Sequence, residues 1–344
     1  MTYTENYQKD LRRIRSAVPN LEPLRGKKVL VTGAGGLICS ALVDFLLSLD
    51  MDVQVYAAGR SPEKLEKRFS FWAENPALHC VRYDALESIE LDVPFDYLIH
   101  GASNASPKAY SAEPVETMLA NLSGIHNILR YAHAHQRGRV LYVSSSEVYG
   151  KKEGSQPYHE QEYGFVDILN PRACYPSSKR AAETLCAAYS KEYGVETVIV
   201  RPGHIYGPTA TASDDRASSQ FPRDVLAGKD IVMKSAGSQL RSYCYVLDCV
   251  SAMVTVLLAG ESGTAYNISN CHSVVTIRQM AEGFAQAAGR KIIFDNPTDA
   301  EASSYNLMDN SGLDASKLEA LGWKACFSLA EGAKSTVEGL KNEQ

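Results

Sequence analysis

The feature that most constrains this chain is the alternation of short β-rich runs with longer helical patterns between residues 27 and 202. The β-rich runs are KVLVTG, VQVYAAG, HCVRYD, FDYLIHGA, RVLYVSSS and TVIVRPG, and the helical patterns cover 40–49, 115–135 and 178–193. This alternation is typical of a parallel sheet with helices on both faces. Runs such as KVLV and TVIV are continuously apolar, as expected of parallel strands that are buried on both sides. The sequence therefore predicts an α/β fold with a doubly wound parallel sheet.

A glycine-rich turn follows the first of these runs and leads directly into a helical pattern. Glycines at this point let the backbone approach a pyrophosphate, whose charge is favoured by the free N–H groups at the helix N-terminus. We therefore expect a Rossmann dinucleotide-binding domain in which Gly33, Gly36, Leu37 and Ile38 contact the cofactor. Cys39 occupies the position of the usual third glycine, so slightly looser packing between helix and strand is expected there.

The end of the second strand leaves the choice between NAD and NADP open. An acidic residue at this point would bind the ribose hydroxyls of NAD, but the chain reads Ala-Ala-Gly-Arg60-Ser instead. Arg60 suits a 2′-phosphate, or it is an ordinary surface arginine. Asp84, which ends the third strand, is a candidate acceptor for the adenine amine or else a loop or capping aspartate.

Tyr175 and Lys179 are four residues apart, so they share one face of a helix. Tyrosine ordinarily titrates near ~10, and a neighbouring ammonium together with a positive nicotinamide ring favours the phenolate. Tyr175 is therefore a candidate general base. The pattern alone is common, but Ser145 follows the strand RVLYV, and ligands of such sheets bind beyond the carboxyl ends of the strands. Pro176 disfavours helical geometry at Tyr175, so the helix should begin about there.

After residue 201 the text becomes rich in Gly, Pro, Ser and Asp, which marks the start of a second lobe. We predict a helical appendage over 1–25, a cofactor domain over 26–202 with a return near 243–270, and a substrate-binding lobe over 203–242 and 271–344. The run RSYCYV, with a helix over 249–258 after it, is the expected return to the main sheet. Leu11, Ile14 and Val18 recur at helical spacing, which predicts a short amphipathic helix ending near Pro19 that serves packing or dimer contact.

Composition excludes several other classes of protein. The 344 residues carry a formal charge of -5 with scattered Lys and Arg, which argues against a nucleic-acid partner. The longest apolar stretches, such as 250–259, are too short to span a bilayer, and the N-terminal text lacks the apolar core of a secretion signal. We expect a cytoplasmic protein without a membrane partner. Eight cysteines form no C-x-x-C pair and no zinc-like cluster, so we interpret them as small buried hydrophobic residues and predict no metal site.

Several motifs occur together in one order: VLVTGAGG, HGASNASP, NLSGIHNIL, SSSEVYG, NPRACYPSSK, RPGHIYGP, GSQLRSYCYVLD and LDASKLEALGW. As a set they resemble the extended short-chain dehydrogenase/reductase family, the NAD-dependent nucleotide-sugar epimerases and dehydratases. The resemblance runs from about residue 27 to about residue 332. Within that family, the chain is most similar to the UDP-glucuronate decarboxylases.

The resemblance implies roles for individual residues. Tyr175 would be the base at the sugar 4-hydroxyl, Lys179 its activator and ribose anchor, Ser145 the hydroxyl partner, and Glu147 an acid/base or orienting group. Arg241 would clamp the substrate diphosphate, which suits its planar fork of donors. The remaining expected contacts are Ala102 and Asn121 on the cofactor side, and Ser146 and His204 on the substrate side.

Three departures from the family pattern bear on the reaction. Ser146 stands where dehydratases place an aspartate, and 308–311 reads Met-Asp-Asn-Ser where decarboxylases carry an Arg-rich segment. His204 replaces an asparagine. The first hypothesis is decarboxylation with tightly held NAD, followed by 4-epimerisation or 4,6-dehydration, with an NADPH-dependent reductase or a catalytically silent dinucleotide sensor as further alternatives. The helices over 113–135 and 178–193 resemble the pair that forms a dimer in relatives, so a homodimer is expected by analogy.

Overall fold

A computed structural model describes residues 3–154, 156–295 and 310–341. Its larger part is a parallel seven-stranded sheet with the strand order β10-β6-β5-β4-β1-β2-β3. The strands are β1 (Lys28–Thr32), β2 (Gln54–Gly59), β3 (Leu78–Arg82), β4 (Tyr97–His100), β5 (Arg139–Val143), β6 (Thr197–Pro202) and β10 (Thr264–Ile268). Every residue of β6 is buried, as the continuous apolar run predicts. The predicted doubly wound α/β sheet is confirmed.

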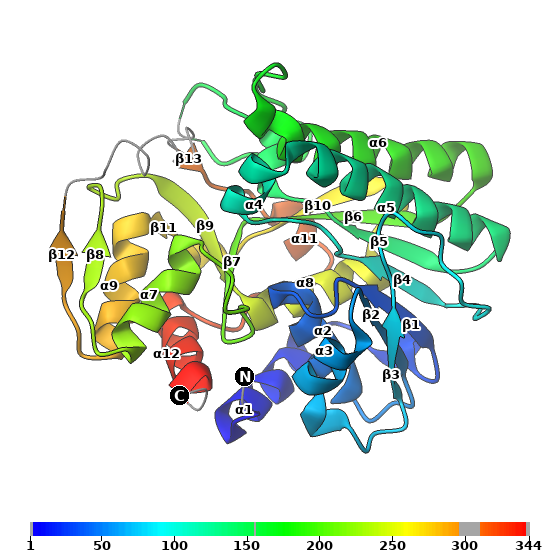
Figure 1. Ribbon diagram of the computed structural model, residues 1–344, viewed down its shortest axis with the longest axis horizontal. Helices are drawn as coiled ribbons and strands as arrows, with labels where there is room; N and C mark the ends of the chain where they lie inside the picture. Colours follow the sequence, from blue (N-terminus) through cyan, green and yellow to red (C-terminus); the bar gives the residue numbers. More distant parts are fainter. Residues whose placement is uncertain (1–2, 155, 296–309, 342–344) are drawn as a thin grey trace.

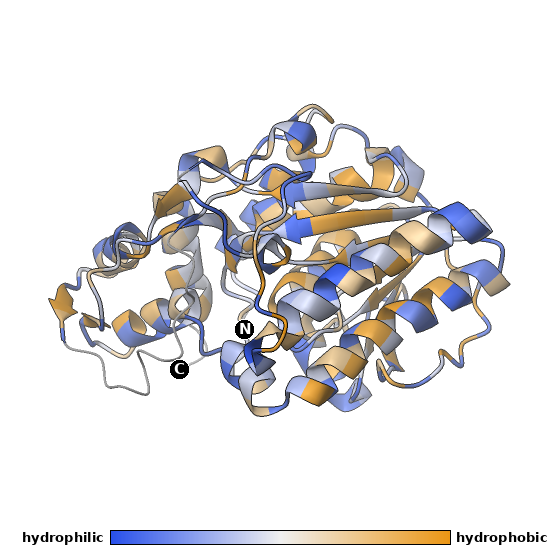
Figure 2. Cartoon of the chain, turned by 90° about the horizontal axis from the view of Figure 1, so that it is seen from above, coloured by the Kyte–Doolittle hydropathy of each residue, from blue (hydrophilic) through white to orange (hydrophobic). Residues whose placement is uncertain are grey.

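Helices cover both faces of this sheet (Figure 1). They are α2 (Leu37–Leu47), α3 (Pro62–Arg68) and α8 (Val246–Ala259) on one side, and α5 (Pro114–Ala134) and α6 (Cys174–Tyr193) on the other, with the short α4 (Pro107–Ala112) beside α5. Successive residues of a strand point to opposite faces. Accordingly, Val29 and Val31 belong to the core under α2 and α8, whereas Leu30 packs into the core under α5 and α6. Seen from above, the strands are largely apolar between helices of mixed hydropathy (Figure 2).

Two helix starts matter for the site. Helix α2 begins at Leu37, three residues before the predicted start, so it follows the glycine turn without a spacer. Helix α6 begins at Cys174, so Tyr175 and Pro176 lie in its first turn, close to the predicted boundary. The first turn of α6 therefore carries the candidate base and the next turn carries Lys179.

The second group of elements forms a smaller lobe beside the sheet (Figure 1). Its strands are β7 (His204–Tyr206), β8 (Ile231–Met233), β9 (Leu240–Tyr245), β11 (Val274–Thr276), β12 (Ile292–Phe294) and β13 (Asn310–Ser311). Its helices are α7 (Ala217–Leu226), α9 (Ile277–Ala287) and α12 (Leu329–Leu340), and the short α11 (Ser316–Glu319) lies against β10. Strand β9 pairs with β7, β11 and β13, and β8 pairs with β12.

One sequence expectation about the main sheet was wrong. The run RSYCYV forms most of β9 in the smaller lobe, and β10 is the strand that returns to the main sheet, parallel to β6. Strand β9 is buried along almost its whole length because β7, β11 and β13 all pair with it in the small sheet. Its apolar pattern therefore looks like that of a main-sheet strand. The helix predicted over 249–258 is present as α8. The proposed domain boundaries stay predictions.

The N-terminal segment contains the expected helix, α1 (Glu5–Arg13), continued by a 3-10 turn over Ile14–Ala17. Its Tyr7 hydroxyl donates to the fully buried Asp44 of α2 at 3.1 Å. On its other side, Asn6 donates to Glu338 at 2.7 Å and Arg13 pairs with Glu331 at 2.9 Å, both on α12. Helix α1 thus packs against both α2 of the larger part and α12 of the smaller lobe.

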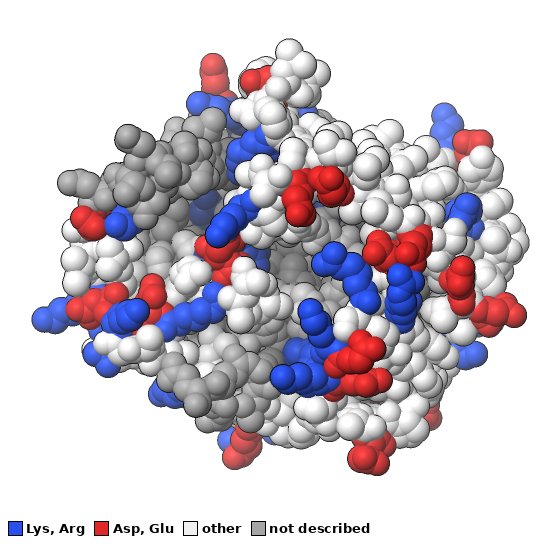
Figure 3. Space-filling view, viewed as in Figure 1, with Lys and Arg blue, Asp and Glu red and all other residues white. Residues whose placement is uncertain are grey.

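The cysteines agree in part with the sequence interpretation. Five are buried, Cys80 and Cys326 are half-buried, and Cys271 is exposed, so the interpretation was wrong for Cys271. On the face shown in Figure 3, basic and acidic side chains are interspersed. Among residues 3–154, 156–295 and 310–341, none of the helices combines the length and apolar character needed to span a bilayer.

Candidate active site

The glycine turn has the shape of a phosphate cradle. Gly33 has φ +69°, and a Cβ placed on it would lie 2.7 Å from the carbonyl oxygen of Gly101 and 2.8 Å from the amide nitrogen of Ala102. Only glycine fits a left-handed turn with the backbone so close. Gly36 is the N-cap of α2 and has no side chain to satisfy the helix's first N–H groups, and the first turn carries no acidic residue. These features fit a dinucleotide pyrophosphate at the α2 N-terminus, the position expected for it.

Cys39 is accommodated by a second glycine rather than by looser packing. It is 4% exposed, and a Cβ on Gly101 would overlap the Cys39 Sγ. The thiol therefore fills the space that a side chain at 101 would take. The expected looser contact is therefore absent, because Gly101, directly after β4, leaves the room that the Cys39 side chain occupies.

Tyr175 and Lys179 face one another on α6 as predicted. The Lys179 Nζ lies 5.7 Å from the centroid of the Tyr175 ring and donates to the carbonyl oxygen of Val143 at 2.8 Å. Both side chains are buried, at 6% and 2% exposure. The Tyr175 ring stacks on Tyr110 of α4, with centroids 5.0 Å apart and an angle of 14° between the planes. The phenol is thus held by a stacked ring and an ammonium in a largely dry environment.

Burial shifts both titrations away from their ordinary values. Burial raises the pKa of Tyr175 to about 12, and the nearby Glu147 carboxylate adds to the rise, while a hydrogen bond with Ser145 and the charge of Arg216 lower it. Burial lowers the pKa of Lys179 to about 7, partly offset by the Glu183 carboxylate. Making the phenolate therefore requires positive charge close to Tyr175. A bound nicotinamide cation and the guanidinium of Arg216 are suited to supply it.

Ser145 and Glu147 lie on the turn that follows β5, which continues as a 3-10 helix over Ser146–Tyr149. The Ser145 Oγ accepts from the Glu147 amide at 3.2 Å, which fixes the turn. The two Glu147 carboxylate oxygens accept from the Tyr110 hydroxyl at 3.3 Å and from the Arg172 Nη1 at 3.4 Å. Arg172 also donates to Tyr110 at 3.2 Å. Glu147 is therefore both close to Tyr175 and part of a polar network, so the two sequence alternatives for it are compatible.

Three basic residues of the smaller lobe interact electrostatically at the site. His204 has a pKa lowered to about 3 by burial and by the charges of Arg241 and Arg216, so its ring is neutral, and its Nδ1 is buried without a hydrogen-bond partner. Arg241 is 4% exposed, and its Nη1 donates to the carbonyl oxygen of Leu240 at 2.9 Å. Arg216 binds Asp214 through Nε and Nη2, while 32% of its side-chain surface stays accessible. This positive environment suits an anionic ligand.

The other predicted residues are placed as follows. Asn121 is buried between α5 and α6, where its amide donates to Ser178 at 2.9 Å and accepts from Ser103 at 2.7 Å. Ser146 is buried at the start of the 3-10 helix that carries Glu147. Arg60 is exposed directly after β2. Asp84 accepts a hydrogen bond from the Leu86 amide at 3.0 Å, which is the contact expected of a loop or capping aspartate. None of these contacts tests cofactor or substrate binding, so the assigned roles stay predictions.

Sequence reasoning missed three residues of the site: Tyr110, Arg172 and Arg216. Arg172 lies inside the motif NPRACY, so its place beside Tyr175 was a signal that could have been used. Tyr110 lies on α4 and Arg216 is the N-cap of α7, and the sequence before each of these helices has no regular pattern. The structure was needed to show that Tyr110 stacks on Tyr175 and that the charge of Arg216 acts on it.

Comparison with known proteins decides the family. The profile of the NAD dependent epimerase/dehydratase family matches residues 29–269, most of the chain. The chain belongs to the NAD-dependent epimerase/dehydratase family. Among its relatives, UDP-glucuronic acid decarboxylase 3 of Arabidopsis thaliana is 31% identical over 328 residues, covering 91% of each chain. UDP-glucuronic acid decarboxylase 1 of Xenopus tropicalis is 30% identical over 322 residues, covering 92% of this chain and 73% of the relative.

Solved structures of epimerases and dehydratases share the fold of this family member. An epimerase of Methanothermobacter thermautotrophicus superposes with a TM-score of 0.81 at 19% identity, covering 97% of this chain and 96% of the other. A dTDP-glucose 4,6-dehydratase of Bacillus anthracis, solved in complex with NAD, gives a TM-score of 0.78 at 19% identity, covering 92% and 97%. At these identities the likeness extends to the fold. The chain is an NAD-dependent enzyme of this family.

Proposed function

We propose that this enzyme removes the carboxylate of a nucleotide-linked uronic acid through a transient 4-keto sugar, with NAD as its cofactor. The observation that carries the proposal is the position of Arg216. Its guanidinium is close enough to Tyr175 to lower the phenol's pKa, it remains partly accessible, and it binds Asp214 through Nε and Nη2. A substrate whose reacting carbon carries a carboxylate suits a guanidinium at this point. The decarboxylase relatives support the same reaction.

Two sets of residues would bind the two ligands, the dinucleotide and the nucleotide sugar. The turn at Gly33 and Gly36 would hold the dinucleotide pyrophosphate, and Lys179 its nicotinamide ribose; when bound, the dinucleotide supplies a hydride acceptor and donor. Arg241 and His204 would hold the sugar-linked diphosphate, since a planar guanidinium fork binds phosphate oxygens well. Arg216 would hold the uronate carboxylate until it leaves.

The chain's own residues carry the proton steps. Tyr175 takes the proton of the sugar 4-hydroxyl, with Ser145 hydrogen-bonded to the same oxygen and the Lys179 ammonium stabilising the phenolate. The C4 ketone that results makes the C5 carboxylate the carboxylate of a β-keto acid, which leaves as carbon dioxide with its bonding electrons passing into the enolate. C5 then takes a proton, for which Glu147 is the candidate group, and C4 is reduced while Tyr175 returns its proton to O4.

The test is mass spectrometry of reactions with UDP-, dTDP-, CDP- and GDP-sugars including UDP-glucuronate, using protein whose bound nicotinamide is identified after denaturation. Loss of carbon dioxide from a uronate, with NAD released on denaturation, is the expected result. An isomer without mass change would identify a 4-epimerase, and loss of water a dehydratase. Turnover only with added NADPH would overturn the proposal of a returned hydride.

A 4-epimerase is the second candidate, because the Tyr175, Lys179 and Ser145 set alone is sufficient for it. Dehydration is less favoured, since Ser146 stands beside Glu147 without a carboxylate of its own. Exposed Arg60 keeps an NADPH-dependent reductase as a further alternative. Tight retention of NAD, a homodimer through α5 and α6 and a cytoplasmic location are further parts of the proposal.

A further inference from the structure

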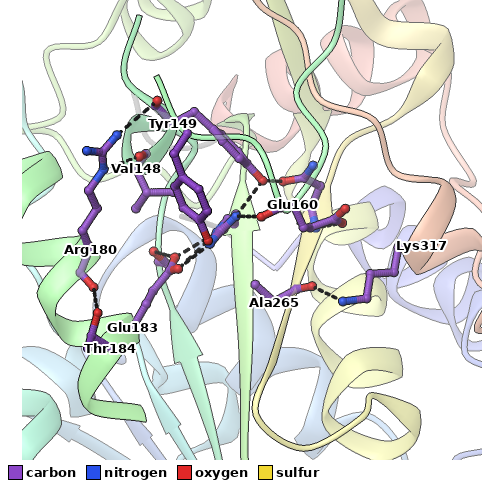
Figure 4. Close-up of polar contacts among 12 residues, drawn as sticks. Val148, Tyr149, Glu160, Arg180, Glu183, Thr184, Ala265 and Lys317 are labelled. Atoms are coloured by element: carbon purple, nitrogen blue, oxygen red, sulfur yellow. Dashed lines mark hydrogen bonds and ion pairs between the residues drawn. The ribbon is translucent and has the colours of Figure 1, made fainter. Parts of the chain in front are cut away.

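An arginine is almost completely buried at the carboxyl end of β6, where the reaction described above does not use it. Arg201 is 2% exposed, and its Nη2 lies 2.6 Å from a Glu183 carboxylate oxygen. The Nε donates to the same carboxylate, Nη1 donates to the Tyr149 hydroxyl and the Glu160 carbonyl, and Nη2 also reaches the Tyr163 hydroxyl. All five N–H donors of the guanidinium therefore have acceptors. The hydrogen-bonding capacity of Arg201 in its pair with Glu183 is therefore fully used. Figure 4 shows the contacts around Glu183, Tyr149 and Glu160.

The Glu183 carboxylate is joined to the active-site turn through Ser144. The Ser144 Oγ donates to a Glu183 oxygen at 2.5 Å, and Ser144 is the residue immediately before Ser145. The residue before Ser144 is Val143, whose carbonyl accepts from the Lys179 Nζ at 2.8 Å. Two neighbouring residues at the end of β5 are thus held by two side chains one turn apart on α6. Glu183 and Lys179 fix the position of Ser145 relative to Tyr175 without touching it.

Arg180 holds the other end of the same turn. Its guanidinium donates to the carbonyl oxygens of Val148 at 2.6 Å and Tyr149 at 3.2 Å (Figure 4). It also donates to the carbonyl oxygen of Gly164 at 2.9 Å. The 3-10 helix that carries Glu147 is therefore attached to α6 at both of its ends. Tyr149 also connects the turn to β10, since its hydroxyl donates to Asn267 at 2.6 Å.

Glu183 also supplies charge to Lys179. The groups that face the Lys179 ammonium come from four elements: Cys39 of α2, His100 of β4, Tyr142 of β5, and Tyr175, Glu183 and Cys186 of α6. Burial lowers the pKa of His100 to about 3 and raises that of Cys39 to about 12 and of Cys186 further still. Within this described set, Glu183 is the one carboxylate, and it acts against the effect of burial on the pKa of Lys179.

We propose that Glu183, neutralised on its far side by Arg201, is a positioning residue that sets both the charge of Lys179 and the place of Ser145. This role rests on the proposed use of Tyr175 as a base. Loss of the carboxylate removes the group that raises the pKa of Lys179 against the effect of burial, so Lys179 is neutral over more of the pH range. A neutral Lys179 no longer stabilises the Tyr175 phenolate, which then forms only at higher pH.

The test uses Glu183→Gln, which keeps an acceptor for Ser144 but removes the charge. The ionisation of Tyr175 is followed in the NAD-bound protein by tyrosinate absorbance, as the difference between each variant and the same variant carrying Tyr175→Phe. We expect the ionisation to move up by about one pH unit. The acidic limb of the kcat/KM profile moves with it, so the rate near neutral pH falls about tenfold and recovers at higher pH.

Two matched variants separate charge from position. Ser144→Ala removes the hydrogen bond but keeps the carboxylate, so kcat should fall with the ionisation unmoved. Glu196→Gln removes a carboxylate that pairs with Arg139 at the other end of these strands and should change neither measurement. If Glu183→Gln fails to fold, the double variant Glu183→Leu with Arg201→Met removes both charges together, which is often tolerated for buried pairs.

An ionisation of Tyr175 at the same pH with and without the Glu183 charge would overturn the proposal, as would an equal shift in Ser144→Ala. The absorbance measurement needs no sugar substrate. A wild-type protein that ionises Tyr175 on binding NAD but converts no nucleotide sugar would therefore refute the proposed function while still deciding the role of Glu183.

Discussion

The two edges of the central sheet use the same strands but treat charge in different ways. At the carboxyl edge, Arg201 and Lys179 are each 2% exposed, and Glu183 is 9% exposed. At the amino edge, Arg139 pairs with Glu196 at 3.3 Å, but the glutamate side chain is 63% exposed. Burying charges costs free energy that their pairing only partly returns, whereas exposed pairs cost and contribute little. Charges are buried where the reaction is proposed to occur, which indicates that position and charge state matter there more than stability.

The amino edge also has a hollow, although it contains no predicted site residue. A cavity of about 450 Å³ is lined there by paired side chains that include Lys27, Asp96 and Arg137. Asp96 binds both cations, at 3.2 Å and 2.5 Å. A hollow of this size therefore does not by itself mark the active site, since the chemistry in parallel sheets occurs beyond the carboxyl ends.

The largest contrast between the edges is expected from two tyrosines on one helix. Tyr175→Phe removes the proposed base at the first turn of α6, and we expect turnover to fall by about a thousandfold or more. Tyr193→Phe at the last turn of α6, where the side chain is 46% exposed, should leave it unchanged. Steady-state rates on the substrate found by mass spectrometry measure both, with bound NAD as the control for folding. Comparable rates for Tyr175→Phe and the wild type would exclude Tyr175 as the base, whereas no turnover by either protein on any sugar would favour the silent dinucleotide sensor.

A second contrast concerns two arginines. Arg201→Met leaves the Glu183 carboxylate buried without its partner, so the free energy of unfolding should fall by about 3–5 kcal/mol. Arg139→Met releases a glutamate that is already in water and should cost about 1 kcal/mol. Urea denaturation of both variants measures the difference. Equal losses would mean that burial of the pair at the carboxyl edge has no special cost.

The smallest effect tests the exchange between Cys39 and Gly101. Gly101→Ala places a methyl group against the Cys39 Sγ, and we expect a loss of about 2 kcal/mol from overpacking. The double variant with Cys39→Gly should recover most of that loss, because the space is returned from the other side. Thermal denaturation of the two single variants and the double variant gives the coupling between the positions. Additive losses would contradict the packing described here.

Regular parts of the molecule were predictable from the sequence, and the reason is physical. Parallel strands buried on both faces have continuous apolar runs, and the turn at Gly33 requires glycine whatever surrounds it. Tyr175 and Lys179 could be paired because helical spacing is fixed. The same reasoning failed for RSYCYV, since a strand at the centre of a small sheet is as buried as one in the large sheet.

The parts that could not be predicted depend on contacts between distant segments. The charge of Arg216 acts on Tyr175 because the fold brings the N-cap of α7, a helix packed against β7 and α9 in the smaller lobe, near α6, and no spacing in the sequence relates the two residues. Cys39 looked like a defect until the fold placed Gly101 against it. Of the departure at Met308 to Ser311, the first two residues lie outside the described part of the chain, which begins again at 310.

The late entry of β10 into the main sheet affects how the protein can be made. Strand β6 ends at residue 202, but its outer neighbour β10 ends at residue 268, after the chain has passed through β7, α7, β8, β9 and α8. During synthesis, the side of β6 that later pairs with β10 therefore has no partner strand while these elements leave the ribosome. Unpaired strands of this kind favour association between chains. Yield in a cell should consequently depend on translation speed and chaperone supply over this interval, more than on the final stability of the enzyme.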